Sequence, residues 1–237
     1  MTESNSKVTV ITGASSGIGA ALVKAYRRAG FRVVANSRSI AASADPGVLA
    51  IAGDAADPAT AARIFSEGVD RFGRIDTLVN NAGIFIAKPF TEYTEEDYAS
   101  IVAINLGSFF RLTKLVAAEM LKQGSGHIVQ ITTGLVDHAN SSVPSVLASL
   151  TKGGLSAATK SLAIEYAKKG IRVNAVAPGV IKTPMHPPET HEFLANLHPV
   201  GRIGESKDVV DAILFLESAA FVTGEILHVD GGQSAGH

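Results

Sequence analysis

Short apolar, β-branched segments alternate with longer helical segments along the whole chain, and this alternation limits the possible folds more than any other feature. Most of the short segments are nearly continuously apolar, as strands are when helices cover both faces of their sheet. Strand–helix–strand repetition implies parallel strands joined by right-handed crossovers. The sequence therefore predicts an α/β fold, a doubly wound sheet of about seven parallel strands with helices on both faces. The expected strands are residues 8–12, 32–36, 48–52, 76–80, 127–132, 172–177 and 225–230.

Capping residues mark the boundaries of several expected helices. Asp57 is followed directly by a proline, which gives an N-cap and a residue suited to the first helical position. Thr94 and Asp97 have the spacing of a capping box. Gly30 and Gly170 are placed to end two further helices.

Composition narrows the class of protein. A chain of 237 residues with 46% hydrophobic content can bury a full core, and we expect one domain over residues 1–237. A formal net charge of -1 without a Lys/Arg-rich block argues against nucleic acid or a membrane surface as partner. The absence of cysteine excludes disulfides and thiolate metal sites. The polar start and the lack of 18 consecutive apolar residues favour a soluble cytoplasmic protein.

Residues 182–204 do not fit the alternation. The segment combines several prolines with His186, His191 and His198, and it follows the sixth expected strand. A long insertion beside the carboxyl ends of parallel strands is typical of a substrate lid, so we expect a lid at about 184–204. The histidine spacing matches no metal-ligand pattern and no carboxylate cluster accompanies it. We therefore interpret the three histidines as solvated loop residues and predict no metal site.

A glycine-rich turn follows the first expected strand. Gly13, Gly17 and Gly19 lie between that strand and the opening of a helix. Glycine allows a sharp turn and a close approach of the backbone to a pyrophosphate, and the helix amino terminus adds N–H donors. Tight strand-to-helix turns also use glycine for purely structural reasons, but the position at the very start of the sheet favours nucleotide binding. The spacing is TGxxxGxG and differs from the commoner GxGxxG.

That spacing and several later segments resemble the short-chain dehydrogenase/reductase family over essentially the whole chain. The resemblance implies a Rossmann-type fold, a nicotinamide dinucleotide, hydride transfer to or from a carbonyl or alcohol carbon of a small molecule, and commonly a homotetramer. Two apolar helices, 102–121 and 149–167, are suited to pairing across a subunit boundary. The matching segments are TGASSGIG (12–19), GDAAD (53–57), NNAG (80–83), Asn105 within IVAINLGSFF, Lys152 within LTKGG, APGVIKTPM (177–185) and TGEILHVDGG (223–232).

The end of the second strand distinguishes between the two nicotinamide dinucleotides. A carboxylate there accepts hydrogen bonds from the ribose hydroxyls and repels a phosphate, whereas a cation accommodates the phosphate. The sequence places Asn36, Ser37 and Arg38 there, with no acid, so NADP(H) is favoured over NAD(H). Alternatively, Arg38 is an ordinary surface arginine, and the glycine-rich turn itself carries no basic residue.

The resemblance also implies the remaining cofactor contacts. Asp54 and Ala55 would border the adenine, and Lys152 would hold the nicotinamide ribose. The other implied contacts are Ser15, Ser16 and Ile18 in the turn, Asn81, Ala82 and Gly83 on the ribose and diphosphate side, and Pro178, Gly179, Ile181 and Thr183 at the nicotinamide end.

The family's catalytic set is incomplete in this sequence. The resemblance implies Asn105, a hydroxyl at Thr133 with Thr132 as its neighbour, and Lys152. The tyrosine expected four residues before the lysine is replaced by Ala148, and there is no tyrosine between Tyr98 and Tyr166. Each retained residue also has a structural interpretation: Asn105 in a bent helix, Thr133 at a strand end, and the lysine extended to solvent.

Three interpretations of Ala148 remain open. In the first, the protein is an oxidoreductase in which water or another side chain replaces the phenol. His138 has the most suitable pKa for acid–base work, although a loop histidine is more often solvated, and Ser142, Ser145 and Ser149 lie nearby. In the second, the chain binds NADP as a regulatory protein or silent subunit. In the third, the enlarged pocket performs different chemistry. We favour the first, because a chain without catalysis has no chemical need for Asn105, Thr133 and Lys152 together, although cofactor binding alone would account for Lys152.

Overall fold

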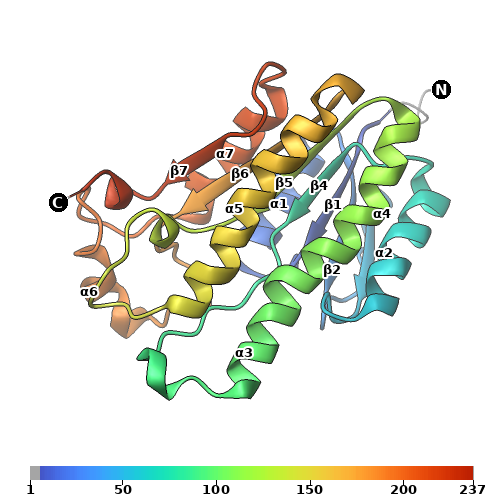
Figure 1. The fold of residues 1–237 in the computed structure, drawn as a ribbon. Coiled ribbons are helices and arrows are strands. Elements are labelled where there is room, and N and C mark those ends of the chain that lie inside the picture. Colours follow the sequence, from blue (N-terminus) through green and yellow to red (C-terminus); the bar gives the residue numbers. More distant parts are fainter. Residues whose placement is uncertain (1–5, 237) are drawn as a thin grey trace.

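A computed structural model describes residues 6–236, which form a seven-stranded parallel sheet with the order β3-β2-β1-β4-β5-β6-β7 (Figure 1). Every pair of neighbouring strands is parallel. The predicted fold class is confirmed. The strands are β1 (Val8–Thr12), β2 (Arg32–Ser37), β3 (Val48–Ala52), β4 (Thr77–Asn80), β5 (Gly126–Ile131), β6 (Ile171–Pro178) and β7 (Ile226–Val229).

Two layers of helices enclose the sheet (Figure 1). One apolar core joins the sheet to α2, α4 and α5, and a second core joins it to α1 and α7. The helices are α1 (Gly17–Arg28), α2 (Pro58–Phe72), α3 (Glu95–Val102), α4 (Ser108–Gln123), α5 (Val146–Tyr166), α6 (His191–Ala195) and α7 (Ser206–Ser218). Shorter turns are η1 (Phe90–Glu92), η2 (Ala103–Gly107), η3 (Gly134–Val136), η4 (Ala167–Lys169), η5 (Pro188–Thr190) and η6 (Gln233–Ala235).

The predicted element boundaries agree closely with the structure. Strands β1 and β3 coincide with the predicted segments, β2 and β4 differ by one residue at one end, and β5, β6 and β7 differ by one residue at both ends. The Asp57 carboxylate accepts from the backbone N–H of Ala59, and Thr94 and Asp97 form a reciprocal capping box. Gly170 ends a helix with a φ of 78°, in the left-handed region that glycine adopts without strain. The capping residues therefore set the helix ends as expected.

Helices α3 and α4 are joined through the π-helical turn η2 into one continuous segment, Glu95–Gln123. By length and composition this segment is the one candidate for a membrane span among the described residues. Core helices of soluble proteins pass the same test. Here α4 contributes Leu112, Val116 and Met120 to the core against the sheet.

The strand order reverses between β1 and its neighbour β4, and this point determines where a ligand can bind. The chain leaves β1 toward β2 on one side and enters β4 on the other. In open parallel sheets, the crevice at such a switch point, outside the carboxyl ends of the strands, is the usual ligand site.

Candidate active site

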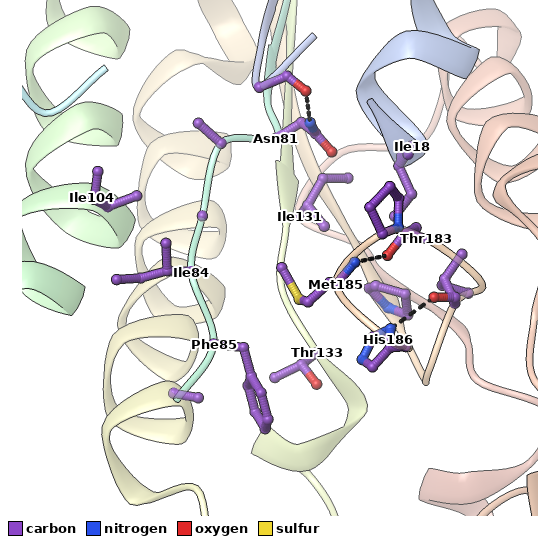
Figure 2. A pocket seen from close by; sticks show the side chains of 18 of the residues that line it. Ile18, Asn81, Ile84, Phe85, Ile104, Ile131, Thr133, Thr183, Met185 and His186 are labelled. Carbon is purple, nitrogen blue, oxygen red and sulfur yellow. Dashed lines mark hydrogen bonds between the residues drawn. The ribbon is translucent and has the colours of Figure 1, made fainter. Parts of the chain in front are cut away.

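A cavity of about 1100 Å³ occupies this switch point (Figure 2). Its walls come from the segments that follow β1, β2, β3, β4, β5 and β6, from the start of α5, and from the segment before α7. The cavity is therefore lined by residues from nearly every part of the chain, and its volume suits a dinucleotide with a small substrate.

The glycine-rich turn forms one wall with backbone rather than side chains. Gly13 and Gly17 have φ angles of 66° and 52°. A Cβ at Gly19 would lie 2.1 Å from the Gly13 carbonyl oxygen, so Gly19 permits close packing of α1 on the turn and does not itself line the cavity. The Ser16 side chain makes no capping bond and the first turn of α1 holds no acid. The free helix N–H groups thus suit an anionic diphosphate.

Asn81 fastens the loop after β4 to this turn. Its Nδ2 donates to the carbonyl oxygens of Thr12 (2.9 Å) and Gly13 (3.2 Å). The Thr12 hydroxyl oxygen in turn accepts from the backbone N–H groups of Asn81 (3.1 Å) and Ala82 (3.0 Å). Asn81 therefore lines the cavity, while its amide holds the two loops in place.

The end of β2 differs in one respect from the predicted phosphate clamp. Asn36 is buried, and its Nδ2 donates to the carbonyl oxygens of Ile51 (2.9 Å) and Gly53 (3.1 Å). Its remaining oxygen is an acceptor without a partner among the described residues, whereas the Ser37 hydroxyl, which also has none, can donate to a phosphate. A phosphate needs donors, so the prediction for Asn36 is wrong as a phosphate ligand. Arg38 is exposed at the cavity edge, where a phosphate can reach it.

Lys152 lies on the floor of the cavity without an acidic partner among the described residues. Its Nζ donates to the Ile131 carbonyl oxygen at 2.6 Å. A Cβ added to Gly83 would lie 3.1 Å from this nitrogen, so the ammonium faces the loop after β4. Burial lowers the pKa of Lys152 to about 8. The expectation that this side chain extends into the cavity rather than to solvent is supported by this geometry.

Asn105 connects the loop after β4 to α5 through its side-chain hydrogen bonds. It lies in the π-helical turn η2, and its Nδ2 donates to the Ile84 carbonyl oxygen and the Thr151 hydroxyl, both at 3.1 Å. Its Oδ1 accepts from the Ile84 N–H at 3.0 Å. Asn105 does not line the cavity. Because its side chain is paired with these groups, it positions the Ile84 loop and α5.

Ala148 marks the place where the resemblance implies a phenol. The residue faces the cavity from the first turns of α5 but is only 1% exposed. It packs with Ile101 and Leu147, against Ile84 and Tyr93. The surroundings of residue 148 are therefore apolar.

Some of the predicted hydroxyl groups line the cavity, whereas His138 does not. Thr133 lines the cavity, and its hydroxyl oxygen accepts from the Leu135 N–H at 3.3 Å, which leaves its hydrogen free to donate. Thr132 instead donates to the Val176 carbonyl oxygen. His138 is not among the residues lining the cavity. Of the nearby serines, Ser142 lines it, and Ser149 donates to the Leu135 carbonyl oxygen at 3.3 Å.

The interpretation of the three histidines as solvated loop residues is wrong for His198, and His186 and His191 are half-buried. His198 is buried, and its Nε2 accepts from the Val180 N–H at 3.0 Å. His191 Nε2 donates to the His186 carbonyl oxygen, and His186 Nδ1 donates to the Ile181 carbonyl oxygen, both at 2.9 Å. Burial lowers the pKa of His186. Each ring has a structural partner that its sequence neighbours do not reveal.

The cavity gathers most of the predicted site residues and some that the sequence did not indicate. Gly19, Asn105 and His138 are the predicted residues outside it. His186 and the buried Gln233 were missed, because nothing in their local sequence distinguishes them. The predicted residues that line the cavity are Gly13, Ser15, Ser16, Gly17, Ile18, Asn36, Ser37, Arg38, Asp54, Ala55, Asn81, Ala82, Gly83, Thr133, Ala148, Lys152, Pro178, Gly179, Ile181 and Thr183.

The parallel sheet, the glycine-rich turn and the cavity at the switch point define a Rossmann-type α/β protein. The chain belongs to the short-chain dehydrogenase/reductase family of oxidoreductases. A family model described as enoyl-(acyl carrier protein) reductase matches residues 13–234.

Curated relatives cover nearly the whole chain. A 3-oxoacyl-[acyl-carrier-protein] reductase FabG of Thermotoga maritima is 36% identical over 95% of this chain and 97% of its own. An L-xylulose reductase of Bos taurus is 38% identical over 94% of each chain. These relatives carry names of different substrates at similar identity, so family membership does not specify a substrate.

Solved structures match the fold with a TM-score of 0.90. ElxO with NADP bound is 30% identical and covers 98% of this chain and 100% of its own. A 3-ketoacyl-(acyl-carrier-protein) reductase from Brucella melitensis complexed with NADH is also 30% identical, over 96% of this chain and 98% of its own. Neighbours of equal similarity therefore hold either nicotinamide dinucleotide.

Proposed function

We propose that the protein is an NADP(H)-dependent oxidoreductase that interconverts a carbonyl and an alcohol on a small molecule without the family's tyrosine. Lys152 carries the proposal, because a buried ammonium at the cavity floor without an acidic partner suits the hydroxyl groups of a nicotinamide ribose. When bound, the nicotinamide supplies or accepts the hydride. The chain's own residues then bind the dinucleotide, orient the substrate and handle one proton.

One half of the cavity would bind the dinucleotide, and the other half would orient the substrate. The glycine-rich turn and the uncapped start of α1 would hold the diphosphate, and Arg38 would contact the adenosine phosphate. Thr133 would donate its free hydroxyl hydrogen to the substrate oxygen. Phe85 and Met185 line the substrate half of the cavity, which favours an apolar substrate (Figure 2).

The alternative is a catalytically weak or inactive NADP-binding regulatory protein or silent subunit. The apolar surroundings of Ala148 favour it, because no phenol or carboxylate stands there to move a proton. The two functions differ in what a restored phenol would do. In the oxidoreductase, only the family's phenol is absent, whereas in the regulatory protein no productive carbonyl position exists.

The test measures NADPH oxidation with a panel of activated ketones and diketones, for the native protein and for Ala148→Tyr. A general acid is typically worth about 10²–10⁴-fold, and we expect Ala148→Tyr to raise the rate toward that range. NADPH binding by fluorescence checks that the variant site is intact. Two inert proteins that both bind NADPH normally would reject the oxidoreductase in favour of the regulatory protein.

We also propose that the protein is a cytoplasmic homotetramer. The side chains of Phe110 on α4 and Ile164 on α5 are 63% and 81% exposed, on the same face of the sheet, which supports burial of these helices by a second copy. Sedimentation of the native protein should give a tetramer, and Ile164→Lys should shift it to a smaller species. A native monomer would contradict this assembly.

A further inference from the structure

Proton transfer in this cavity requires an ionisable group near Thr133 and Ala148. Among the described residues that line the cavity, the ionisable side chains are those of Arg38, Asp54, Lys152 and His186. Arg38 and Asp54 follow β2 and β3, at the end proposed for the adenosine. Two ionisable groups are therefore left for the substrate half of the cavity, Lys152 and His186.

Lys152 is poorly placed to meet a substrate directly. It is partly buried, donates to the Ile131 carbonyl oxygen and lies against Gly83. Its proposed ribose contact would use the donors that remain. The Lys152 ammonium would thus be occupied by the Ile131 carbonyl oxygen and by the cofactor ribose, and not by the substrate.

His186 is held in the cavity lining by hydrogen bonds that leave one ring nitrogen free. Its Nδ1 lies 2.9 Å from the Ile181 carbonyl oxygen, which can only accept, so Nδ1 carries the hydrogen. Its backbone N–H donates to the Thr183 carbonyl oxygen at 3.0 Å, and its own carbonyl oxygen accepts from His191. Within residues 6–236, Nε2 has no hydrogen-bond partner. The tautomer and the ring orientation are therefore both fixed.

The free nitrogen is turned into the cavity. In Figure 2, the bonded nitrogen of His186 points back to its own loop, and the other side of the ring faces the part of the cavity that contains Thr133. Thr133 has a free hydroxyl hydrogen on that side. A substrate oxygen lying between them would meet one neutral donor and one titratable nitrogen.

We propose that His186 is the catalytic acid–base residue that replaces the phenol, exchanging a proton between Nε2 and the substrate oxygen. This inference rests on the proposed oxidoreductase function. In reduction, the Nε2–H bond of the imidazolium breaks and an O–H bond forms on the oxygen, while the carbonyl carbon takes the hydride. The reduced nicotinamide would supply that hydride, so the products would be an alcohol, the oxidised dinucleotide and neutral His186. In oxidation, neutral Nε2 accepts the alcohol proton.

The charges around His186 set the pH dependence. Burial lowers its pKa, the Ile181 carbonyl opposes this, and His191 of α6 lowers it further. Lys152 is the other ionisable group in this half of the cavity. Reduction needs the imidazolium, so its rate should fall as pH rises through a pKa below 6.5. Oxidation needs the neutral ring and should rise over the same interval.

The experiment compares His186→Asn with His191→Asn. The asparagine Nδ2 at position 186 can still donate to the Ile181 carbonyl oxygen, while nothing replaces Nε2. His191 belongs to the same segment but lies outside the cavity lining, so His191→Asn is the matched control. We expect His186→Asn to lower kcat by about 10²-fold or more, to remove the ionisation below pH 6.5 and to leave NADPH affinity unchanged. The control should keep the native kcat and the ionisation, with the pKa of His186 moved upward because His191 no longer lowers it.

Two further measurements separate the possible failures. Adding Ala148→Tyr to His186→Asn should restore turnover, with a pH dependence that now belongs to the phenol. A native protein that turns over the panel while His186→Asn keeps the same rate and pH profile would overturn the role of His186 alone. A native protein that binds NADPH but is inert across the panel, with Ala148→Tyr equally inert, would overturn the proposed function itself.

Discussion

Two partly buried ionisable groups lie at opposite ends of the strands, Glu217 at their amino ends (the amino edge) and Lys152 at their carboxyl ends (the carboxyl edge). The Glu217 Oε2 lies 2.9 Å from the Thr77 hydroxyl, 3.0 Å from His127 Nδ1 and 3.3 Å from the Tyr26 hydroxyl. Lys152 has one carbonyl oxygen as its partner and no acidic partner within the described residues. One group has its full set of partners inside the protein, and the other does not.

The pKa values of the two groups move in opposite senses with respect to charge. Burial alone would raise the pKa of Glu217, but hydrogen bonds from His127 and Thr77 outweigh it and lower the pKa, so the charged form is stabilised. Burial lowers the pKa of Lys152 to about 8, so its charged form is destabilised. The hydrogen-bonded Glu217 at the amino edge therefore stabilises the fold. Lys152 at the carboxyl edge destabilises it, because its charge lacks a partner that a bound ligand would supply.

The largest effect is expected at the amino edge. Glu217→Ala leaves three buried donors without an acceptor and should lower the free energy of unfolding by about 3–5 kcal/mol. Urea unfolding measures this loss. Asp211→Ala on the same helix is the control, because its pair with Lys207 is exposed and should contribute less than about 1 kcal/mol. Equal losses in the two variants would remove the distinction between the edges.

Arg38→Ala should change cofactor selection and leave stability alone. An arginine–phosphate contact is worth about 1.5–3 kcal/mol, so NADPH affinity should fall by roughly 10- to 100-fold while NADH affinity stays the same. Fluorescence titration with both dinucleotides measures the two constants. A native protein that binds both equally, or a variant that keeps its preference, would show that Arg38 is an ordinary surface residue.

Lys152→Met should affect stability and binding in opposite directions. Removing a buried, unpaired ammonium should raise the free energy of unfolding by about 1–2 kcal/mol at pH 7. NADPH affinity should fall by about 10-fold as the ribose contact is lost. Unchanged NADPH affinity would reject the ribose role.

The pH dependence provides a check on this charge assignment. The folded pKa of about 8 lies below the unfolded value of 10.5, so the native protein should gain stability as pH rises from 8 to 10.5. This gain should be absent from Lys152→Met. An identical rise in both proteins would assign the titration to another group.

The smallest expected effect is the loss of unfolding free energy when acid protonates His127 at the amino edge. Burial lowers the pKa of His127 below 6.5, so the unfolded chain binds a proton that the folded protein does not. Stability contributed by neutral His127 is thus present above pH 6.5 and decreases below it, with a slope of at most about 1.4 kcal/mol per pH unit. Unfolding of His127→Gln between pH 5 and 7 should lack this slope. A slope that persists in the variant would come from elsewhere.

The sequence predicted the strands and helix caps whose formation depends on residues close to one another in the chain. Strands β1 and β3, the Asp57 cap and the Thr94–Asp97 box depend on neighbouring residues, and all four were predicted. Lys152 was placed in the cavity because of its spacing within a family pattern. These features require no knowledge of how distant elements pack.

The errors concern side chains whose partners lie far away in sequence. Asn36 was assigned to a phosphate because the register that sets its amide against β3 is not visible in β2. The Glu217 group was missed, since Tyr26 and Glu217 are 191 residues apart. His186 was grouped with solvated histidines, because its carbonyl partner is chosen by the turn and not by composition.

The Asn36 amide also bears on how readily this protein can be redesigned for the other dinucleotide. The usual change introduces a carboxylate at the end of β2 to select a ribose without phosphate. At residue 36 a carboxylate would face the carbonyl oxygens of Ile51 and Gly53 and repel both. Asn36→Asp alone would therefore weaken the attachment of β3 to the sheet. A redesign must start instead from the exposed Ser39 or Arg38, and cofactor choice in this chain can evolve there without disturbing the fold.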